Sequence, residues 1–251
     1  MILKKDLNGR CIIIYLNLIA NLFIILCIIK PICAQNISHY VGYAYDSKTK
    51  KLLYTDTYQE TKINNQLYAK ASYRDVKNQL LAQKHVTFNQ QLASPSFYFK
   101  NHVTGVIASV NVGLSNINVW YRPSFLKDFS KSEISLKEQS VVDAGFHYYV
   151  LKHWDSLLKG QQIAVNYIAP SRGTEISLHL FFVQTENKNN QTYHVFKVQA
   201  QSFLIRLFFP AIVLHYDANT KQLLRFEGLS NIKLGKKPNH VFMTFKYLNH
   251  I

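Results

Sequence analysis

Hydrophobic and polar residues alternate along much of this chain, with the two-residue period of strands that have one dry and one wet face. Residues 85–91, HVTFNQQ, and residues 116–122, NINVWYR, show the alternation most clearly. Turn residues separate such segments at intervals that are typical of a meander or a barrel. The pattern predicts strands over 39–45, 51–59, 66–74, 79–88, 96–100, 105–113, 116–122, 161–169, 174–184, 191–199, 211–216, 222–230 and 240–247. A mainly β protein with an antiparallel sheet is therefore expected.

Three stretches share one pattern: a tyrosine, an aspartate, a few polar residues and a pair of leucines. They are YDSKTKKLL at 45–53, YRDVKNQLL at 73–81 and YDANTKQLL at 216–224. An aspartate side chain can accept hydrogen bonds from backbone N–H groups about two residues further on, and so start a turn. A turn that closes onto a core also explains the repeated leucines, which a ligand loop does not need. We therefore predict three hairpin turns rather than three binding loops.

One segment, between residues 138 and 160, has the period of a helix instead. Spacings of four, three, four and three place one set of side chains on a single helical face, namely Asp143, His147, Val150, Trp154 and Leu157. Asp143 suits the N-cap position, and Gly160 follows the last apolar residue as a C-cap would. We expect one amphipathic helix over about 143–159, packed across a curled antiparallel sheet or half-barrel.

The first 34 residues differ from the rest of the chain. Basic residues precede an apolar run over 11–29, and the small residue Ala34 closes the segment. This arrangement is typical of a cleaved signal peptide, which leaves 35–251 as a single β-rich domain. The apolar run is also long enough to span a bilayer, so an uncleaved anchor formed by 11–29 is the alternative. In both cases we expect export through the inner membrane, with the periplasm as the predicted location.

The chain is strongly basic, with 29 Lys and Arg against 14 Asp and Glu. Taking away the four basic residues and the one acidic residue of the first 34 leaves 25 against 13. Most of these basic residues are scattered lysines, and no stripe alternates arginine with aromatic residues. The distribution is typical of a solvated surface, so we predict no nucleic acid partner. Peripheral contact with an anionic membrane is a partner that the charge leaves open.

Few residues indicate catalysis. Asp143 and His147, four apart on the predicted helix, can touch, and an Asp-oriented His is a common general base. No G-x-S-x-G motif accompanies them, and all three cysteines precede residue 35, so a helix cap and a half-buried histidine is the simpler interpretation. The ten histidines have no metal-binding spacing, and the nine glycines form no phosphate loop. We predict no metal and no cofactor.

Aromatic and arginine side chains are the candidates for ligand binding. Trp154 on the helix and Trp120 on a strand would line a cavity together with strand phenylalanines, namely Phe97, Phe99, Phe181 and Phe196. Arg172, in APSR, and Arg206, inside an apolar run, would face a polar head group if they are buried. The same aromatics could instead fill the core, and strand alternation could turn Arg206 outward.

Three motifs carry a resemblance to a known group of proteins. They are VVDAGFHYYVLKHWDSLLKG at 141–160, APSR at 169–172 and YDANTKQLLRFEGLSNI at 216–232. With them the chain resembles an uncharacterised family of exported proteobacterial proteins, which implies export but no known activity. Its layout of strands, helix and strands is similar to that of the periplasmic half-barrels that carry lipoproteins or lipids. A fold alone does not fix a function.

These observations favour an exported non-enzymatic protein that binds a lipid or another hydrophobic molecule in a half-barrel cavity. An envelope hydrolase with a site near Asp143 and His147 is one alternative. A structural subunit of an envelope complex is another, with an edge strand near 240–247 that would pair with a partner.

Overall fold

The computed structural model describes residues 34–188, 190–208, 210–234 and 239–248. The chain divides after Ala34, and residues 35–251 form one compact unit. The predicted signal peptide or anchor at 1–34 lies outside the described residues, apart from Ala34 itself. Within the described ranges, no helix has both the length and the apolar character needed to cross a membrane.

Fifteen strands make up one sheet in the described part of the chain. They are β1 (Ala34–Asp46), β2 (Leu52–Ile63), β3 (Gln66–Asp75), β4 (Leu80–Thr87), β5 (Ser96–Asn101), β6 (Ile107–Val112), β7 (Asn116–Arg122), β8 (Ser130–Ser135), β9 (Ser140–Val141), β10 (Ile163–Ala169), β11 (Thr174–Lys188), β12 (Gln191–Ala200), β13 (Ile212–Asp217), β14 (Leu223–Leu229) and β15 (His240–Tyr247). Their order across the sheet is β8-β7-β6-β5-β4-β3-β2-β1-β15-β14-β13-β12-β11-β10-β9.

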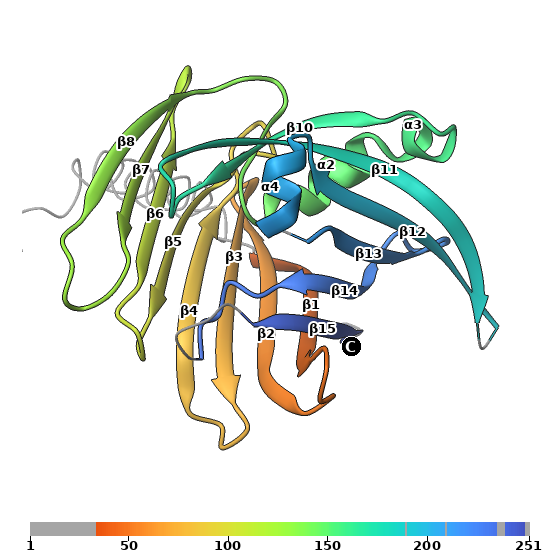
Figure 1. Cartoon of the computed structure of the whole chain (residues 1–251), viewed down its shortest axis with the longest axis horizontal. Coiled ribbons are helices and arrows are strands. Elements are labelled where there is room, and N and C mark those ends of the chain that lie inside the picture. Colours follow the sequence, from red (N-terminus) through yellow and green to blue (C-terminus); the bar gives the residue numbers. More distant parts are fainter. Residues whose placement is uncertain (1–33, 189, 209, 235–238, 249–251) are drawn as a thin grey trace, which may run out of the picture. The chain divides into compact units, whose positions relative to one another are not determined.

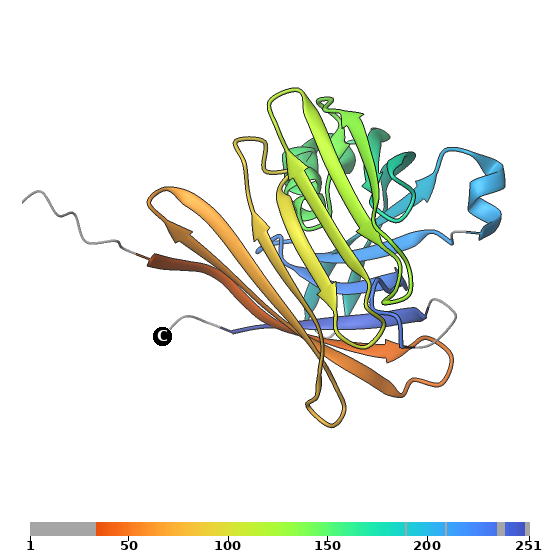
Figure 2. The same cartoon turned by 90° about the vertical axis from the view of Figure 1, so that its left-hand side faces the viewer.

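Two antiparallel meanders build this sheet. Strands β1 to β8 follow one another outward to one edge, and β10 to β15 return from the other edge to the middle, where β15 pairs with β1. The short β9 pairs with β10 in parallel. The edges are β8 and β9, and no strand pairing joins them among the described residues, so the curled sheet stays open (Figures 1 and 2).

This architecture confirms the predicted mainly β fold with a curled antiparallel sheet. Every predicted strand is present, but the alternation does not predict β8 or β9. Strand β8, SKSEIS, is mostly exposed and polar, so it lacks the dry face that reveals a strand in a sequence. The expectation of an edge strand near 240–247 is wrong, because β15 lies in the middle of the sheet between β1 and β14.

Three short helices accompany the sheet in the described residues: α2 (Gly145–Lys152), α3 (Trp154–Leu158) and α4 (Phe203–Phe208). The first two together occupy the place of the single helix predicted over about 143–159. They are separated at His153, where the backbone leaves the helical region with φ of −104° and ψ of 12°. The segment is therefore a broken helix rather than a continuous one.

The caps of this broken helix agree with the sequence at one end only. Gly160 follows α3 with φ of +81°, the left-handed conformation predicted for a C-cap glycine. At the other end the N-cap is Ala144, and it makes no side-chain capping hydrogen bond. Asp143 stands one residue earlier with φ of +41°, so the expectation that it caps the helix is wrong.

The three Tyr-Asp-Leu-Leu stretches are hairpin turns, as predicted. Oδ1 of Asp46 accepts backbone N–H groups from Lys48 (3.0 Å) and Thr49 (2.7 Å) in the turn between β1 and β2. Oδ1 of Asp217 accepts the N–H groups of Asn219 and Thr220 between β13 and β14. The third turn, between β3 and β4, repeats this with Oδ1 of Asp75 as the acceptor. The shared sequence pattern therefore encodes a shared turn.

Two hydrophobic clusters fill the inner side of the curl. The first packs the strands of the β1–β8 meander around side chains such as Tyr54, Phe88 and Ile117. The second packs α2 and α3 against β10 to β14, with Leu180 and Phe196 fully buried at its centre. The interior is thus divided between the two meanders.

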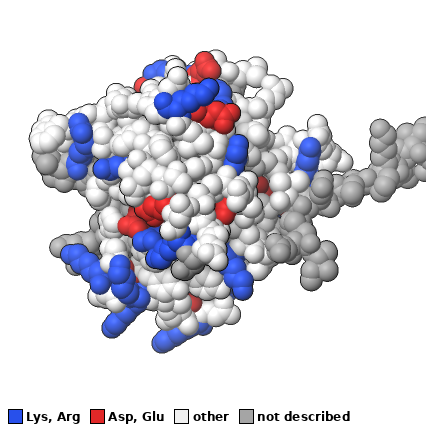
Figure 3. Space-filling model, turned by 90° about the vertical axis from the view of Figure 1, so that its right-hand side faces the viewer, with Lys and Arg blue, Asp and Glu red and all other residues white. Residues whose placement is uncertain are grey.

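Charges on the surface are dispersed. On the face shown in Figure 3, Lys and Arg are more numerous than Asp and Glu and lie in several separate places. No continuous basic stripe crosses this face, which agrees with the scattered lysines of the sequence.

Candidate functional site

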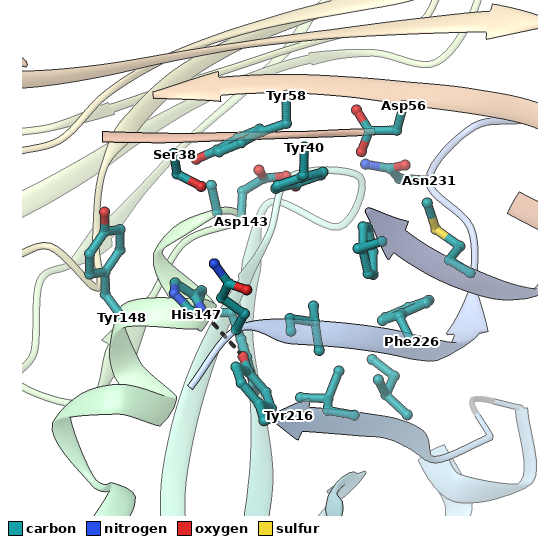
Figure 4. Close-up of a pocket in the computed structure, with 18 of the residues that line it drawn as sticks. Ser38, Tyr40, Asp56, Tyr58, Asp143, His147, Tyr148, Tyr216, Phe226 and Asn231 are labelled. Carbon is teal, nitrogen blue, oxygen red and sulfur yellow. Dashed lines mark hydrogen bonds between the residues drawn. The ribbon is translucent and has the colours of Figure 1, made fainter. Parts of the chain in front are cut away.

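The inner side of the sheet holds a cavity of about 610 Å³, a size typical of small-molecule sites. Helix α2 bridges the two meanders beside it. The Tyr148 hydroxyl donates a hydrogen bond to Glu60 on β2 (2.9 Å). The next helical residue toward the N-terminus, His147, lies within hydrogen-bond distance of Tyr216 on β13 (3.3 Å; Figure 4). The helix therefore fixes the spacing of the two meanders around the cavity.

One side of the cavity, which we call the polar wall, comes from β1 to β4 and the residue pair before α2. Alternation along β2 turns every second residue inward, and in the sequence YTDTYQE these inward residues are buried. The polar wall consists of Ser38, Tyr40, Tyr54, Asp56, Tyr58, Glu60, Tyr73, Lys84 and Asp143. It therefore combines three carboxyl groups and one amine with a set of tyrosines.

Lys84 and Asp143 form an ion pair in the polar wall. Nζ of Lys84 is 2.6 Å from Oδ1 of Asp143, and the two side chains are 9% and 16% exposed. Burial alone would lower the pKa of Lys84, but the charge and hydrogen bond of Asp143, together with the nearby Asp56, outweigh burial and the pKa is raised. Lys84 is therefore charged, and its charge is matched by that of Asp143.

Asp56 has no such partner. It is 7% exposed, and its Oδ1 atom is buried without a hydrogen bond to any residue that the structure describes. Burial raises the pKa of Asp56 to about 7, with Lys84 opposing the rise and Asp143 adding to it. A buried carboxylate without a partner is costly, and such groups mark functional sites more often than structural ones.

Glu60 is buried but fully provided with donors. The hydroxyls of Tyr58 and Tyr148 donate to its two carboxylate oxygens, at 2.6 and 2.9 Å. Burial raises the pKa of Glu60, and these two hydrogen bonds act in the opposite direction. Four residues earlier on the same face of β2, Oδ1 of Asp56 has no such donor among the described residues.

The opposite side of the cavity, which we call the apolar wall, comes from β11 to β15. Its members are aliphatic or aromatic, namely Leu178, Val198, Ile212, Leu214, Leu223, Phe226, Leu229, Met243 and Phe245. Polar groups border this wall, from Thr220, Lys221 and Gln222 in the turn between β13 and β14 and from the phenols Tyr216 and Tyr247. Figure 4 shows Phe226 and unlabelled apolar side chains on one side, with Asp56, Asn231 and Tyr40 on the other. The cavity is therefore amphipathic across its width.

The predicted pair of Asp143 and His147 does not form. Asp143 binds Lys84, whereas His147 stacks on Tyr216 with ring planes 6° apart and centroids at 5.7 Å. Burial lowers the pKa of His147 to about 4, so the imidazole is neutral at physiological pH. No hydrogen bond joins Asp143 to His147 in the described part of the chain, although both line the cavity.

The aromatic residues predicted to bind a ligand lie in the core or away from the cavity. Trp154 is 4% exposed and packs on Phe196, with ring centroids 5.2 Å apart. Trp120 is half-buried on β7. Neither tryptophan lines the cavity, and the same holds for the phenylalanines Phe97, Phe99, Phe181 and Phe196.

The two arginines proposed for a head group are exposed. Arg172 lies in the turn after β10. Arg206 lies in α4, where its Nη2 atom donates to the carbonyl oxygen of Gln201 (3.3 Å). Neither residue lines the cavity.

Sequence reasoning missed the polar wall, although a signal for it was present. In residues 54–60, Tyr54, Asp56, Tyr58 and Glu60 occupy every second position. A strand face that carries two tyrosines is expected to be the dry one, so carboxylates on that face are out of place unless they have a role.

The described residues hold no group of three or more His, Cys, Asp and Glu side chains that is arranged to bind a metal ion. Two of the three carboxylates of the polar wall are instead engaged, Glu60 with tyrosines and Asp143 with Lys84. What this arrangement offers chemically is hydrogen bonding and charge at one side of a cavity, opposite a dry surface.

The fold is similar to solved structures of proteins without assigned function. A β-barrel-like protein of the domain of unknown function DUF1849, from Brucella abortus, matches with a TM-score of 0.51 and 8% identity, over 86% of this chain and 98% of that one. A DUF1329 family protein from Desulfovibrio piger matches with a TM-score of 0.33 and 8% identity, over 91% and 89% of the two chains. The second score is too low to carry an argument.

No protein-family model and no curated protein matches the chain. The likeness to the Brucella protein shows the fold alone, and it agrees with the barrel-like layout that the sequence resemblance implied. The motifs of that resemblance and the export that it implies stay predictions.

Proposed function

We propose that residues 35–251 act as an exported, non-enzymatic binding protein that holds a lipid or another hydrophobic molecule inside the curled sheet. The observation that carries the proposal is the cavity of about 610 Å³ with an extended apolar surface on β11 to β15. An alkyl chain laid against that wall would gain about 0.8 kcal/mol for each methylene removed from water.

The open sheet supports this proposal, because a curled sheet that does not close leaves room for a ligand between its faces. Export enters the proposal from the N-terminal sequence pattern alone. The barrel-like fold shared with the Brucella protein is compatible with a carrier but brings no activity of its own.

The two alternatives have less support. A hydrolase centred on Asp143 and His147 would need them to act together, and each has a different partner. A structural subunit that pairs through residues 240–247 would need a free edge there, and β15 is paired on both sides.

Native mass spectrometry of the protein, expressed from its full coding sequence and purified without detergent, tests the proposal. We expect a reproducible added mass that dissociates as a hydrophobic small molecule. Protein stripped of that mass is expected to take up a fluorescent fatty acid or fatty alcohol. A bare protein mass combined with no uptake of either probe would overturn the proposal.

A pair of tryptophan variants locates the binding. Leu223→Trp places a large ring in the cavity and is expected to reduce probe uptake at least tenfold. Leu224→Trp places the same ring at the next position of β14, which does not line the cavity, and is expected to leave uptake unchanged. Equal effects of the two variants would place the probe outside the cavity.

A further inference from the structure

Charge in the polar wall is unbalanced. It holds three carboxyl groups, on Asp56, Glu60 and Asp143, and a single amine, on Lys84. Asp143 already neutralises Lys84, at 2.6 Å. Tyrosine hydroxyls satisfy Glu60. Oδ1 of Asp56 is left over, nine-tenths buried and without a donor from the described residues.

The surroundings of Asp56 suit a cation. Tyr40, Tyr54 and Tyr73, on β1, β2 and β3, lie close enough to interact electrostatically with its carboxylate. The Tyr73 ring already has an ammonium group over its face, because Nζ of Lys84 lies 5.9 Å from its centroid. Burial raises the pKa of each of these phenols, so all three rings stay neutral. Neutral aromatic faces next to a carboxylate attract ammonium groups through cation–π and charge–charge interactions. An anionic head group would instead meet two carboxylates and a lysine that is already paired.

We propose that the polar wall binds an ammonium group carried by the hydrophobic ligand, with Asp56 as its counter-ion and the tyrosine rings as its cage. The inference rests on the proposed function, because it assumes that a hydrophobic chain occupies the apolar wall. The ligand class is therefore a cationic amphiphile, with the alkyl chain on one wall and the amine on the other.

The basic surface of the protein does not oppose this assignment inside the cavity. The formal net charge of the chain is +15, but exposed charges are screened beyond about 8 Å at physiological ionic strength. The groups that face Asp56 within the cavity decide the preference. Among the cations, only Lys84 acts on the Asp56 carboxylate, and Asp143 neutralises it. Lys221 also lines the cavity, but it lies in the turn between β13 and β14, with its Nζ over the Trp154 ring at 5.2 Å from the centroid.

Three ligands with the same ten-carbon chain test the proposal: decylamine, decanol and decanoate. Isothermal titration calorimetry on the full chain stripped of bound ligand is expected to rank decylamine at least tenfold tighter than decanol, with decanoate weakest. Asp56→Asn is expected to remove the preference for the amine, so that decylamine binds no tighter than decanol. Asp75→Asn, in the exposed turn after β3, is the matched control and is expected to change nothing.

The preference for decylamine is also expected to grow from pH 6 to pH 8. Asp56 loses its proton in this interval, while Lys84 stays charged and the neighbouring tyrosines stay neutral. Failure of all three ligands to bind overturns the proposed function. Binding in which decanoate is equal or tighter, or in which Asp56→Asn keeps the preference, overturns the ammonium site and leaves the proposed function standing.

A second feature lies outside the cavity, in the loop between β7 and β8. Phe125, Leu126 and Phe129 are 58%, 94% and 46% exposed. The guanidinium of Arg122 lies over both phenylalanine rings, 5.9 and 5.4 Å from their centroids. Backbone N–H of Phe125 also donates to the carbonyl oxygen of Thr104 (3.3 Å). An ordered loop therefore presents apolar side chains to solvent.

We infer that this loop inserts into an anionic lipid surface. Its apolar tip is flanked by Arg122, Lys127 and Lys131, with Asp128 as the only acid in the segment 122–131. Apolar side chains would enter the acyl boundary while the basic residues meet the lipid phosphates. The charge of the flanks argues for this surface over a neutral one.

Flotation with vesicles tests the second inference. The full chain is expected to float with vesicles that contain phosphatidylglycerol and to float at least tenfold less with pure phosphatidylcholine. The double variant Phe125→Ser and Leu126→Ser is expected to abolish flotation. Leu114→Ser is the matched control, because Leu114 is fully exposed in the turn at the opposite end of β7. Equal losses in both variants, or equal flotation with both vesicles, would overturn the inference.

Discussion

The polar wall and the apolar wall face each other across one cavity, yet they are built differently. On the polar wall, β2 alternates tyrosines with carboxylates on its buried face, and their energies depend on individual partners. On the apolar wall, the contribution of the aliphatic and aromatic side chains from β11 to β15 comes from burial and packing, without specific partners. In the proposed function, the apolar wall would supply affinity for an alkyl chain, and the polar wall would supply the choice of head group.

The same difference appears among the aspartates. Asp217, in a hairpin turn, receives backbone N–H groups and a side-chain donor, Gln191, and its pKa is lowered although burial alone would raise it. Asp56, in the polar wall, receives none for its Oδ1 atom and has a raised pKa. The fold supplies hydrogen-bond donors to the turn aspartate, whereas it supplies none to Oδ1 of Asp56 among the described residues.

Removing the lysine of the polar wall is expected to have the largest effect. Lys84→Met leaves Asp143 buried and unpaired, which should cost about 3–5 kcal/mol of unfolding free energy, measured by urea denaturation. On the apolar wall, Leu178→Met conserves volume and should cost less than about 1.5 kcal/mol. The double variant Lys84→Met and Asp143→Asn should recover most of the loss. If Lys84→Met alone lowered the unfolding free energy by no more than Leu178→Met, the two walls would not differ in their dependence on individual partners.

The sequence predicted the fold well because local patterns set it. Alternation located the long strands, and aspartate-led stretches such as YDANTKQLL located the turns, since both depend on residues close together in the chain. The break at His153 was missed because the apolar spacing continues across it. Strand β9 was missed because two residues are too few for a pattern.

The site could be predicted only in part. Lys84 and Asp143 are 59 residues apart, and they meet through strand register and through the path of the chain before α2, neither of which a sequence pattern contains. Asp56 and Glu60 were within reach, because alternation places them on the same face as Tyr54 and Tyr58. Aromatic content did not predict which residues line the cavity, because aromatic side chains fill cores as well as line cavities.

Neutralising Asp56 is expected to have the next largest effect, with a sign that depends on pH. The folded state holds the Asp56 proton more tightly than the unfolded state, so wild-type stability falls as pH rises from about 4 to about 7. Asp56→Asn removes this loss and should stabilise the ligand-free protein by about 2–4 kcal/mol at pH 8, with little gain at pH 4. Asp217→Asn should destabilise at pH 8 instead, because the pKa of Asp217 is lowered. The urea midpoints of both variants and of wild type are measured at pH 4 and pH 8. A change in stability of the same sign for both variants at pH 8 would contradict the comparison.

His147 lies between the two walls. Its effect on the pH dependence of stability should be smaller than that of Asp56 and opposite in sign. The folded state disfavours its proton, so stability should fall as pH drops from about 6.5 to about 4. Partial exposure of the His147 side chain limits the loss to about 1–2 kcal/mol. His147→Gln should abolish it, and His85→Gln, on the exposed face of β4, should not. Each slope is read as the difference between variant and wild type in thermal unfolding, because the slopes of His147 and Asp56 oppose each other.

The aspartates of the hairpin turns, which do not line the cavity, should give the smallest effects and prove to be structural. Asp217→Ala removes the acceptor for two backbone N–H groups and should lower Tm by about 2–4 °C at neutral pH. Asp46→Ala should lower it less, because water replaces the lost acceptor at that exposed turn. Neither change should alter the binding of decylamine, since neither residue lines the cavity. If Asp217→Ala lost decylamine binding while its Tm stayed unchanged, this turn would be a ligand-binding loop.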